Sequence, residues 1–179
     1  MTHKKYRAFF AWEHEREEKW LDTQSDKGLQ LIRGGGISYV FEEGTPGEYA
    51  YKILLLDELP THSKSRDFLR FLEETGVEVV GSYMRWVYLR RRRAEGPFEI
   101  YSDVDSKILH LKKIRTLLLG LLPLEAAAFL GNAGIGLHGS PGNFLLSLLL
   151  GFILVMIITH SLQITGKLKD LAQERVIHE

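Results

Sequence analysis

The sequence predicts an α+β domain followed by a transmembrane hairpin of two helices. Charged residues are dense up to Arg115, nearly absent from there to Gly166 and present again afterwards, although the formal net charge of the 179 residues is zero. The charge-poor part contains two apolar segments of helical length. The charged part before it alternates between short β-type runs and amphipathic helical patterns. Its length suits one domain with a single core.

The second apolar segment, Phe144–Leu162, has no charged residue and is long enough to cross a bilayer core, which takes about 20 helical residues. The first, Thr116–Leu130, is interrupted by Pro123 and Glu125. A glycine-rich loop joins the two. The expected hairpin covers residues 116–165, with spans at about 114–135 and 143–164. A buried hairpin in a soluble protein is the alternative.

Basic residues flank the hairpin on both sides, at Lys112, Lys113 and Arg115 before it and at Lys167, Lys169 and Arg175 after it. The loop 131–143 has neither Lys nor Arg. By the positive-inside rule, both termini face the cytoplasm of a cell-membrane protein. Residues 1–20 lack the apolar core of a signal peptide, so export of the first domain is not expected.

The first domain, residues 1–95, divides into strands and helices bounded by glycine- and proline-containing turns. The expected strands are Lys5–Trp12, Leu29–Arg33, Ile37–Glu43, Glu48–Leu56, Val77–Val80 and Met84–Arg91, and the expected helices are Glu13–Lys27 and Ser63–Thr75. A linker helix follows at 96–115, which Asp103 or Asp105 could cap. A helical cytoplasmic tail is expected at 166–179.

The element order is β-α-β-β repeated twice, which predicts a duplicated, ferredoxin-like domain. Trp20-Leu21 and Phe68-Leu69 occupy matching places before the helix-ending glycines Gly28 and Gly76. With one gap in the alignment, Tyr39-Val40-Phe41 matches Trp86-Val87-Tyr88. We expect a mostly antiparallel sheet with both helices on one face.

Three strands carry aromatic pairs on one side, namely Tyr39 and Phe41, Tyr49 and Tyr51, and Trp86 and Tyr88. Three interpretations are open. The aromatic side chains could form the core beneath the helices, line a ligand cleft between the repeats, or form a partner or dimer surface.

Two groups of charged residues invite a functional interpretation. The run Arg90, Arg91, Arg92 and Arg93 is either a solvated strand end or, with Lys112, Lys113 and Arg115, a contact for anionic lipid headgroups. Glu125 falls near the middle of the first span, where a carboxylate must be protonated, paired or turned to a helix interface. Its nearest candidate partner on the second span is Thr159.

The sequence supplies no motif for catalysis, metal binding or nucleic-acid recognition. Cysteine is absent, which excludes disulfides, thiolate metal sites and a cysteine nucleophile. The histidines lack metal-ligand spacing. The run 34–36 lacks the lysine of a phosphate-binding loop and is expected to be a turn. No basic excess or recognition motif indicates nucleic acid. We expect no catalytic residues, no metal and no cofactor.

The runs Glu15–Leu31, Tyr39–Phe41 and Tyr49–Tyr51, together with Tyr101-Ser102-Asp103 and Ser106-Lys107 before the first span, resemble bacterial domain-of-unknown-function family 2812 (DUF2812). The resemblance covers about residues 5–115. It implies an integral membrane protein, mostly of Gram-positive bacteria, often encoded beside PadR-type regulators. It implies no established activity.

The sequence therefore leads us to expect a non-enzymatic binding or regulatory module at the membrane. Its cytoplasmic domain would recognise a small molecule or a protein partner, and the chain would associate with that partner or with itself. The alternative is an accessory subunit of a membrane transporter or of an oligomeric, channel-like assembly, in which Glu125 is the functional residue.

Overall fold

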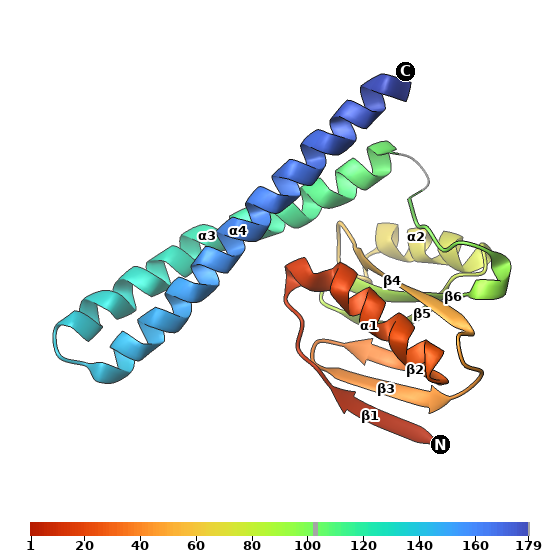
Figure 1. Cartoon of the computed structure of the whole chain (residues 1–179), viewed down its shortest axis with the longest axis horizontal. Coiled ribbons are helices and arrows are strands. Elements are labelled where there is room, and N and C mark those ends of the chain that lie inside the picture. The colour runs from red at the N-terminus through yellow and green to blue at the C-terminus, as the bar shows by residue number, and fades with distance from the viewer. Residues whose placement is uncertain (102–103, 179) are drawn as a thin grey trace. The chain divides into compact units, whose positions relative to one another are not determined.

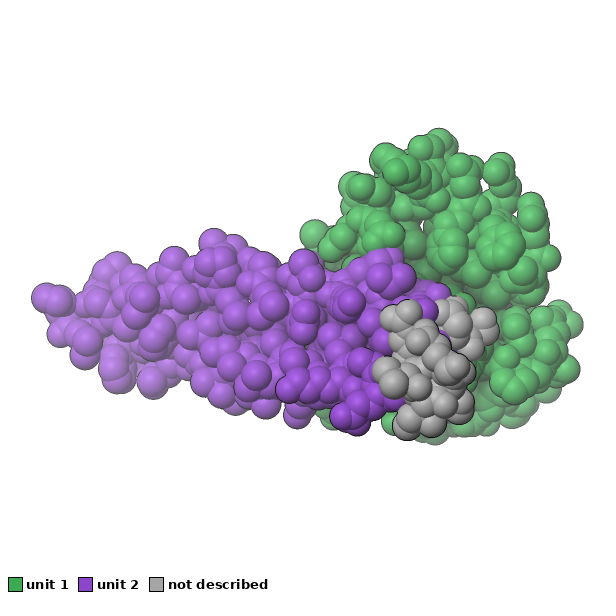
Figure 2. All heavy atoms as spheres, turned by 90° about the horizontal axis from the view of Figure 1, so that it is seen from above, with its two compact units in different colours: residues 1–100 green, residues 101–179 purple. Residues whose placement is uncertain are grey.

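The computed structural model describes residues 1–101 and 104–178, with side chains up to residue 174. The chain divides into two compact units, Met1–Ile100 and Tyr101–Glu179, which Figure 2 distinguishes by colour. The first unit is an α+β domain with a six-stranded sheet, and the second consists of two long apolar helices. This confirms the predicted fold class at that level.

The strands and α-helices of the first unit lie close to their expected positions. They are β1 (Thr2–Tyr6), α1 (His14–Asp26), β2 (Leu29–Gly35), β3 (Ser38–Glu43), β4 (Tyr49–Leu55), α2 (Ser63–Glu74), β5 (Glu78–Tyr83) and β6 (Trp86–Arg92). The main difference is β1, which we expected at Lys5–Trp12. The chain instead turns toward α1 after β1, where the N–H of Phe10 donates to Glu13 Oε2 at 3.1 Å.

The sheet has the order β1-β3-β2-β5-β6-β4, and its neighbouring strands are antiparallel except β2 and β5 (Figure 1). In the units β1-α1-β2 and β4-α2-β5, each helix connects two parallel strands. The first unit leads from the β1 edge toward the middle of the sheet, and the second leads from the β4 edge toward the middle, so the two crossovers run in opposite directions. Right-handed crossovers then place α1 and α2 on opposite faces. In Figure 1, α1 lies in front of the sheet and α2 behind it. The expectation that both helices share one face is therefore wrong.

The hairpins β2–β3 and β5–β6 repeat one geometry at a spacing of 48 residues. The register shifts between Leu31 and Arg33 in the first hairpin and between Val79 and Gly81 in the second. The same spacing separates two pairs of residues with positive φ, Gly28 and Gly76 after the helices and Gly36 and Met84 in the hairpin turns. No gap is needed at this spacing, so the predicted match of Tyr39 with Trp86 is replaced by Tyr39 with Val87.

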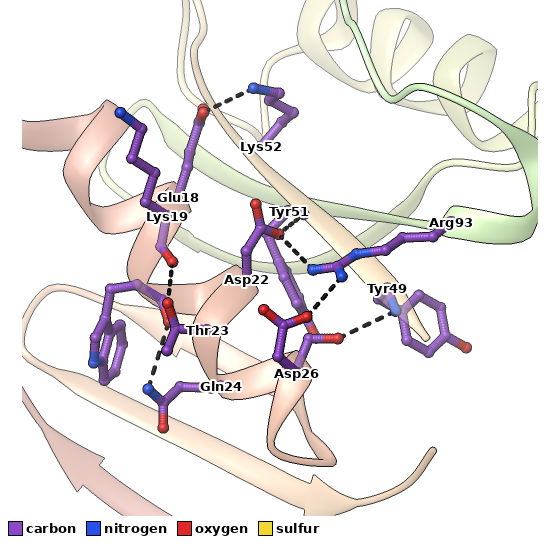
Figure 3. A network of polar contacts seen from close by, with 12 residues as sticks. Glu18, Lys19, Asp22, Thr23, Gln24, Asp26, Tyr49, Tyr51, Lys52 and Arg93 are labelled. Atoms are coloured by element: carbon purple, nitrogen blue, oxygen red, sulfur yellow. Dashed lines mark hydrogen bonds and ion pairs between the residues drawn. The ribbon is translucent and has the colours of Figure 1, made fainter. Parts of the chain in front are cut away.

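Side chains of α1 satisfy the free edge of β4 (Figure 3). The N–H groups of Tyr49, Tyr51 and Ile53 point away from β6, because the strand alternates and the even-numbered residues Glu48 and Leu56 make the bonds to the β6 side. Figure 3 shows Tyr49 and Tyr51 beside α1. These three N–H groups donate to Ser25 Oγ at 3.2 Å, Asp22 Oδ1 at 3.0 Å and Glu18 Oε1 at 2.8 Å, respectively. The acceptors are four and three residues apart and so lie on one helical face. A covered edge cannot pair with another strand.

The sheet curves around α1. The hydroxyl of Tyr51 on β4 accepts a hydrogen bond of 2.8 Å from the N–H of Leu31 on β2, although β5 and β6 separate these strands in the sheet order. Arg90 on β6 donates to the carbonyl of Leu31 at 2.8 Å. Leu21 of α1 is fully buried within this curve and packs with Leu31 and the aromatic side chains around it.

The second unit is an antiparallel helical hairpin of α3 (Val104–Leu137) and α4 (Pro141–His178). The loop between the two helices is shorter than the predicted loop 131–143, because residues 131–137 continue α3. Gly151 lies against the Phe129 ring, which a Cβ atom at this position would approach to 3.0 Å, so the glycine allows the two helices to pack closely. The cap expected at Asp103 lies outside the described residues, and Asp105 lies in the first turn of α3.

Both helices are long and apolar enough to cross a membrane. In their most apolar stretches only 11% of the α3 residues and 17% of the α4 residues are buried. A core helix of a soluble protein would hide most of such a stretch.

The substitution Ser25→Ala tests the contact between α1 and the free edge of β4. Ser25 is fully buried, accepts from Tyr49 N–H and donates to Gln30 Oε1 at 2.9 Å. The change leaves the Tyr49 N–H without an acceptor, while Gln30 Oε1 keeps a hydrogen bond from the Tyr51 hydroxyl at 3.3 Å. It should lower the free energy of unfolding by about 1–3 kcal/mol. The measurement is urea denaturation of the full chain in detergent, followed by tryptophan fluorescence, because all three tryptophans lie in the first unit.

The matched control is Thr23→Ala, which deletes a hydroxyl on the exposed side of the same helix. It should change stability by no more than about 0.5 kcal/mol. Equal effects of the two substitutions would contradict the contact's role.

Candidate functional site

The six predicted aromatic residues pack beneath α1. Tyr39, Phe41, Tyr49, Tyr51 and Tyr88 are buried in one core cluster, and Trp86 is partly buried against it. Of the three interpretations left open by the sequence, a place in the core beneath the helices describes most of these residues. Their side chains do not form an exposed face. Two of them, Trp86 and Tyr88, also line a pocket.

The pocket lies in the first unit and has a volume of about 230 Å³. It is bounded by the segment leading into α1, by the first turn of α1, and by the turns of the two hairpins. Its lining comprises Phe9, Phe10, Ala11, His14, Glu17, Gly36, Ile37, Ile53, Tyr83, Trp86 and Tyr88. Both hairpin turns contribute to it, so the pocket lies between the two β-α-β-β halves of the sheet.

A buried carboxylate forms the floor of the pocket. Glu17 is 6% exposed, and its Oε1 accepts hydrogen bonds from the hydroxyl of Tyr39 and, at 2.8 Å, from that of Tyr88. Among the described residues, Oε2 of Glu17 accepts no hydrogen bond and Glu17 has no ion-pair partner. One carboxylate oxygen is therefore fixed by the protein and the other is available to a ligand.

Burial raises the pKa of the Glu17 carboxyl above its ordinary value, and the hydrogen bonds from Tyr39 and Tyr88 oppose that rise. Glu13 and Glu18 add to the rise through charge repulsion. Burial also raises the pKa of both tyrosines, so their hydroxyls remain protonated donors at neutral pH.

Aromatic rings form the walls and the mouth of the pocket. The His14 ring stacks on that of Trp86, with centroids 5.8 Å apart. Phe10 stacks on Trp12 at 4.7 Å. Phe10 and Tyr83 are about half exposed and lie at the opening. The arrangement suits a small molecule that carries an apolar group and one polar or charged group.

Sequence reasoning missed Glu17 because it stands in a run of charged residues. A signal was nevertheless present. Glu17, Leu21 and Gln24 follow the helical spacing of a single face, and all three are buried. An acid at the same face as the apolar Leu21 indicates a carboxylate directed into the domain.

The arginine run is used largely inside the domain. Arg90 pairs with Glu78 at 2.7 Å and lies over the Tyr49 ring, while Arg91 donates to the carbonyls of residues 95, 96 and 97. Arg93 pairs with Asp26 at 2.6 Å. Arg92 is the most exposed of the four, with Glu48 4.0 Å away. A lipid contact of Arg92, or of Lys112, Lys113 and Arg115 on α3, stays a prediction.

Glu125 lies within the apolar part of α3. Its Oε1 is buried without a hydrogen-bond partner among the described residues. Thr159 does not pair with it, since the Thr159 hydroxyl donates to the carbonyl of Val155 at 2.8 Å. In the described part of the chain, no group of three His, Asp or Glu side chains is arranged to hold a metal ion.

The fold and the site define an α+β domain with a small acidic, aromatic-lined pocket, joined to a hairpin of two long apolar helices. The model of one protein family, described as "Protein of unknown function (DUF2812)", matches residues 13–122. The chain belongs to this family, as its resemblance in sequence led us to expect. No curated protein and no solved structure matches the chain.

The raised pKa of Glu17 predicts a pH dependence of stability. The folded domain retains the Glu17 proton to higher pH than the unfolded chain, whose value lies near 4.5. Stability from this group is therefore present at low pH and is lost as the pH rises from about 4.5 through the folded-state pKa. The free energy of unfolding of the wild type, minus that of Glu17→Gln, should fall between pH 4.5 and pH 8. A difference that stays constant or rises with pH would contradict this assignment.

Proposed function

We propose that this chain is a non-enzymatic binding module of the cell membrane. Its first unit binds a small molecule in the Glu17 pocket, and its helical hairpin anchors it in the bilayer. The observation that carries the proposal is the pocket itself, because it combines aromatic walls with a buried carboxylate that has one unused oxygen. Binding of the small molecule would be passed to a protein partner or to a second copy of the chain.

A duplicated β-α-β-β origin of the first unit supports a pocket between the two halves. The support comes from the hairpin registers and positive-φ residues that recur at a spacing of 48. It also comes from apolar helix residues that match at this spacing, such as Leu21 of α1 with Leu69 of α2. Related halves meet at β2 and β5, and the pocket opens beside the turns that follow these two strands.

The pocket is proposed for binding rather than catalysis because aromatic rings dominate its lining. A ring-lined site with one fixed acid is suited to recognition of shape and charge. Nucleic acid is not the proposed ligand, since the sequence carries no basic excess.

The test is purification of the full chain from its native membrane in mild detergent, followed by native mass spectrometry. A bound small molecule that is lost in Trp86→Leu, a change at the pocket wall, would support the proposal. A chain that is recovered repeatedly without any small molecule, and whose pocket substitutions alter no association, would contradict it.

The membrane orientation gives a second prediction, which the cysteine-free sequence makes simple to test. A single cysteine at His138, in the turn between α3 and α4, should react with a membrane-impermeant maleimide added to intact cells. A single cysteine at Thr23, on the exposed side of α1, should react only after permeabilisation. Labelling of Thr23→Cys in intact cells would contradict cytoplasmic termini.

An accessory subunit of a transporter or channel-like assembly is the second candidate function. The buried, unpartnered Oε1 of Glu125 favours it, because a polar atom in an apolar helix needs a partner from another chain or a bound proton. We expect Glu125→Gln to leave the protein companions and copy number unchanged in native mass spectrometry. Loss of a stoichiometric companion from a normally folded Glu125→Gln protein would favour the accessory role instead.

A further inference from the structure

Resting on the proposed function, we infer that the Glu17 pocket selects small organic cations, such as a trimethylammonium or alkylammonium group. The cationic group would lie against Glu17 Oε2 and the rings of Trp86 and Tyr88. The inference depends on the pairing of buried charges, on the aromatic lining and on the size of the pocket.

Adjacent carboxylates on α1 differ in their partners. Glu18 is buried and pairs with Lys52 Nζ at 3.0 Å. Glu17 is equally buried, but no cation of the described residues pairs with it. A buried carboxylate without a counter-charge is costly, and a ligand cation would supply the missing charge.

The lining favours a cation over an anion. It includes the rings of Phe9, Phe10, Tyr83, Trp86 and Tyr88, whose faces attract cations. No lysine or arginine lines the pocket in the described part of the chain. The Arg7 guanidinium lies over the rings of Phe9 and Trp20, and Arg7 is exposed and does not line the pocket. Besides Glu17, the titratable side chains of the lining are His14, Tyr83 and Tyr88.

The volume limits the ligand to a small molecule. At about 30 Å³ for each water-sized group, 230 Å³ holds roughly eight such groups. A ligand of that size is comparable to choline. Choline also has a neutral analogue of the same shape, 3,3-dimethylbutan-1-ol, and a related anion, 3,3-dimethylbutanoate, which makes the charge preference measurable.

The experiment is isothermal titration calorimetry of the full chain in a nonionic detergent with these three probes. We expect choline to bind about tenfold more tightly than 3,3-dimethylbutan-1-ol, and the anion to bind more weakly than either. Glu17→Gln keeps the shape of the side chain and an acceptor for the tyrosines, and it should remove most of the preference for choline over the alcohol, leaving only the part that the rings supply. Glu15→Gln makes the same charge change on the exposed side of α1 and should leave the preference intact.

A second variant, Trp86→Leu, keeps an apolar side chain while it removes the ring. It should weaken choline binding several-fold more than binding of the alcohol. This result does not depend on whether Glu17→Gln folds.

The outcomes separate the inference from the proposed function. Equal affinities for choline and the alcohol, or tighter binding of the anion, would overturn cation selection while small-molecule binding stands. Failure of all three probes to bind would also overturn it, and native mass spectrometry would then decide the proposed function independently.

Discussion

Three hydrogen bonds between α1 and the edge of β4 fix the geometry on which the rest of the first unit depends. Ser25, Asp22 and Glu18 accept from alternate N–H groups of β4, so the helix has one rotation and one position along the strand. The sheet must curve to bring β4 to this helix, as the bond between Tyr51 and Leu31 shows. With that rotation set, the neighbouring face of α1, which carries Glu17 and Leu21, is directed into the concave side of the sheet.

The pocket follows from the same arrangement. The segment before α1 only partly closes the space beside the two hairpin turns, and this space is the pocket. Glu17 lies at the bottom of this space, and tyrosines from β3 and β6 hold one of its oxygens. The carboxylate is thus desolvated and oriented before any ligand arrives, which reduces the ordering that binding requires. The proposed cation selectivity depends on this preorganised acid.

Much of the fold could be predicted from the sequence, because strand and helix patterns are local. The positions of α1, α2 and five of the strands, the two apolar helices and the family all follow from runs such as Ser63–Glu74 and Phe144–Leu162. The placement of α2 on the opposite face could not, since it depends on the parallel pairing of β2 with β5. Of the residues that line the candidate pocket, only Trp86 and Tyr88 were among those singled out from the sequence. Glu17 was missed because a buried acid and a solvated acid look alike until the contacts of their helix are known. The ion pairs of Arg90 and Arg93 were also missed, because their partners Glu78 and Asp26 are distant in sequence.

Residue-resolved hydrogen exchange of the full chain tests the interlock of α1 with β4 most directly. The outward N–H groups of Tyr49, Tyr51 and Ile53 should exchange as slowly as amides in the middle of the sheet, because each donates to an α1 side chain. On the opposite edge, the strand alternation turns the N–H groups of Lys4 and Tyr6 outward, and these should exchange much faster. Equally fast exchange at both edges would show that α1 does not hold β4, and the fixed position of Glu17 beneath the pocket would then have no basis.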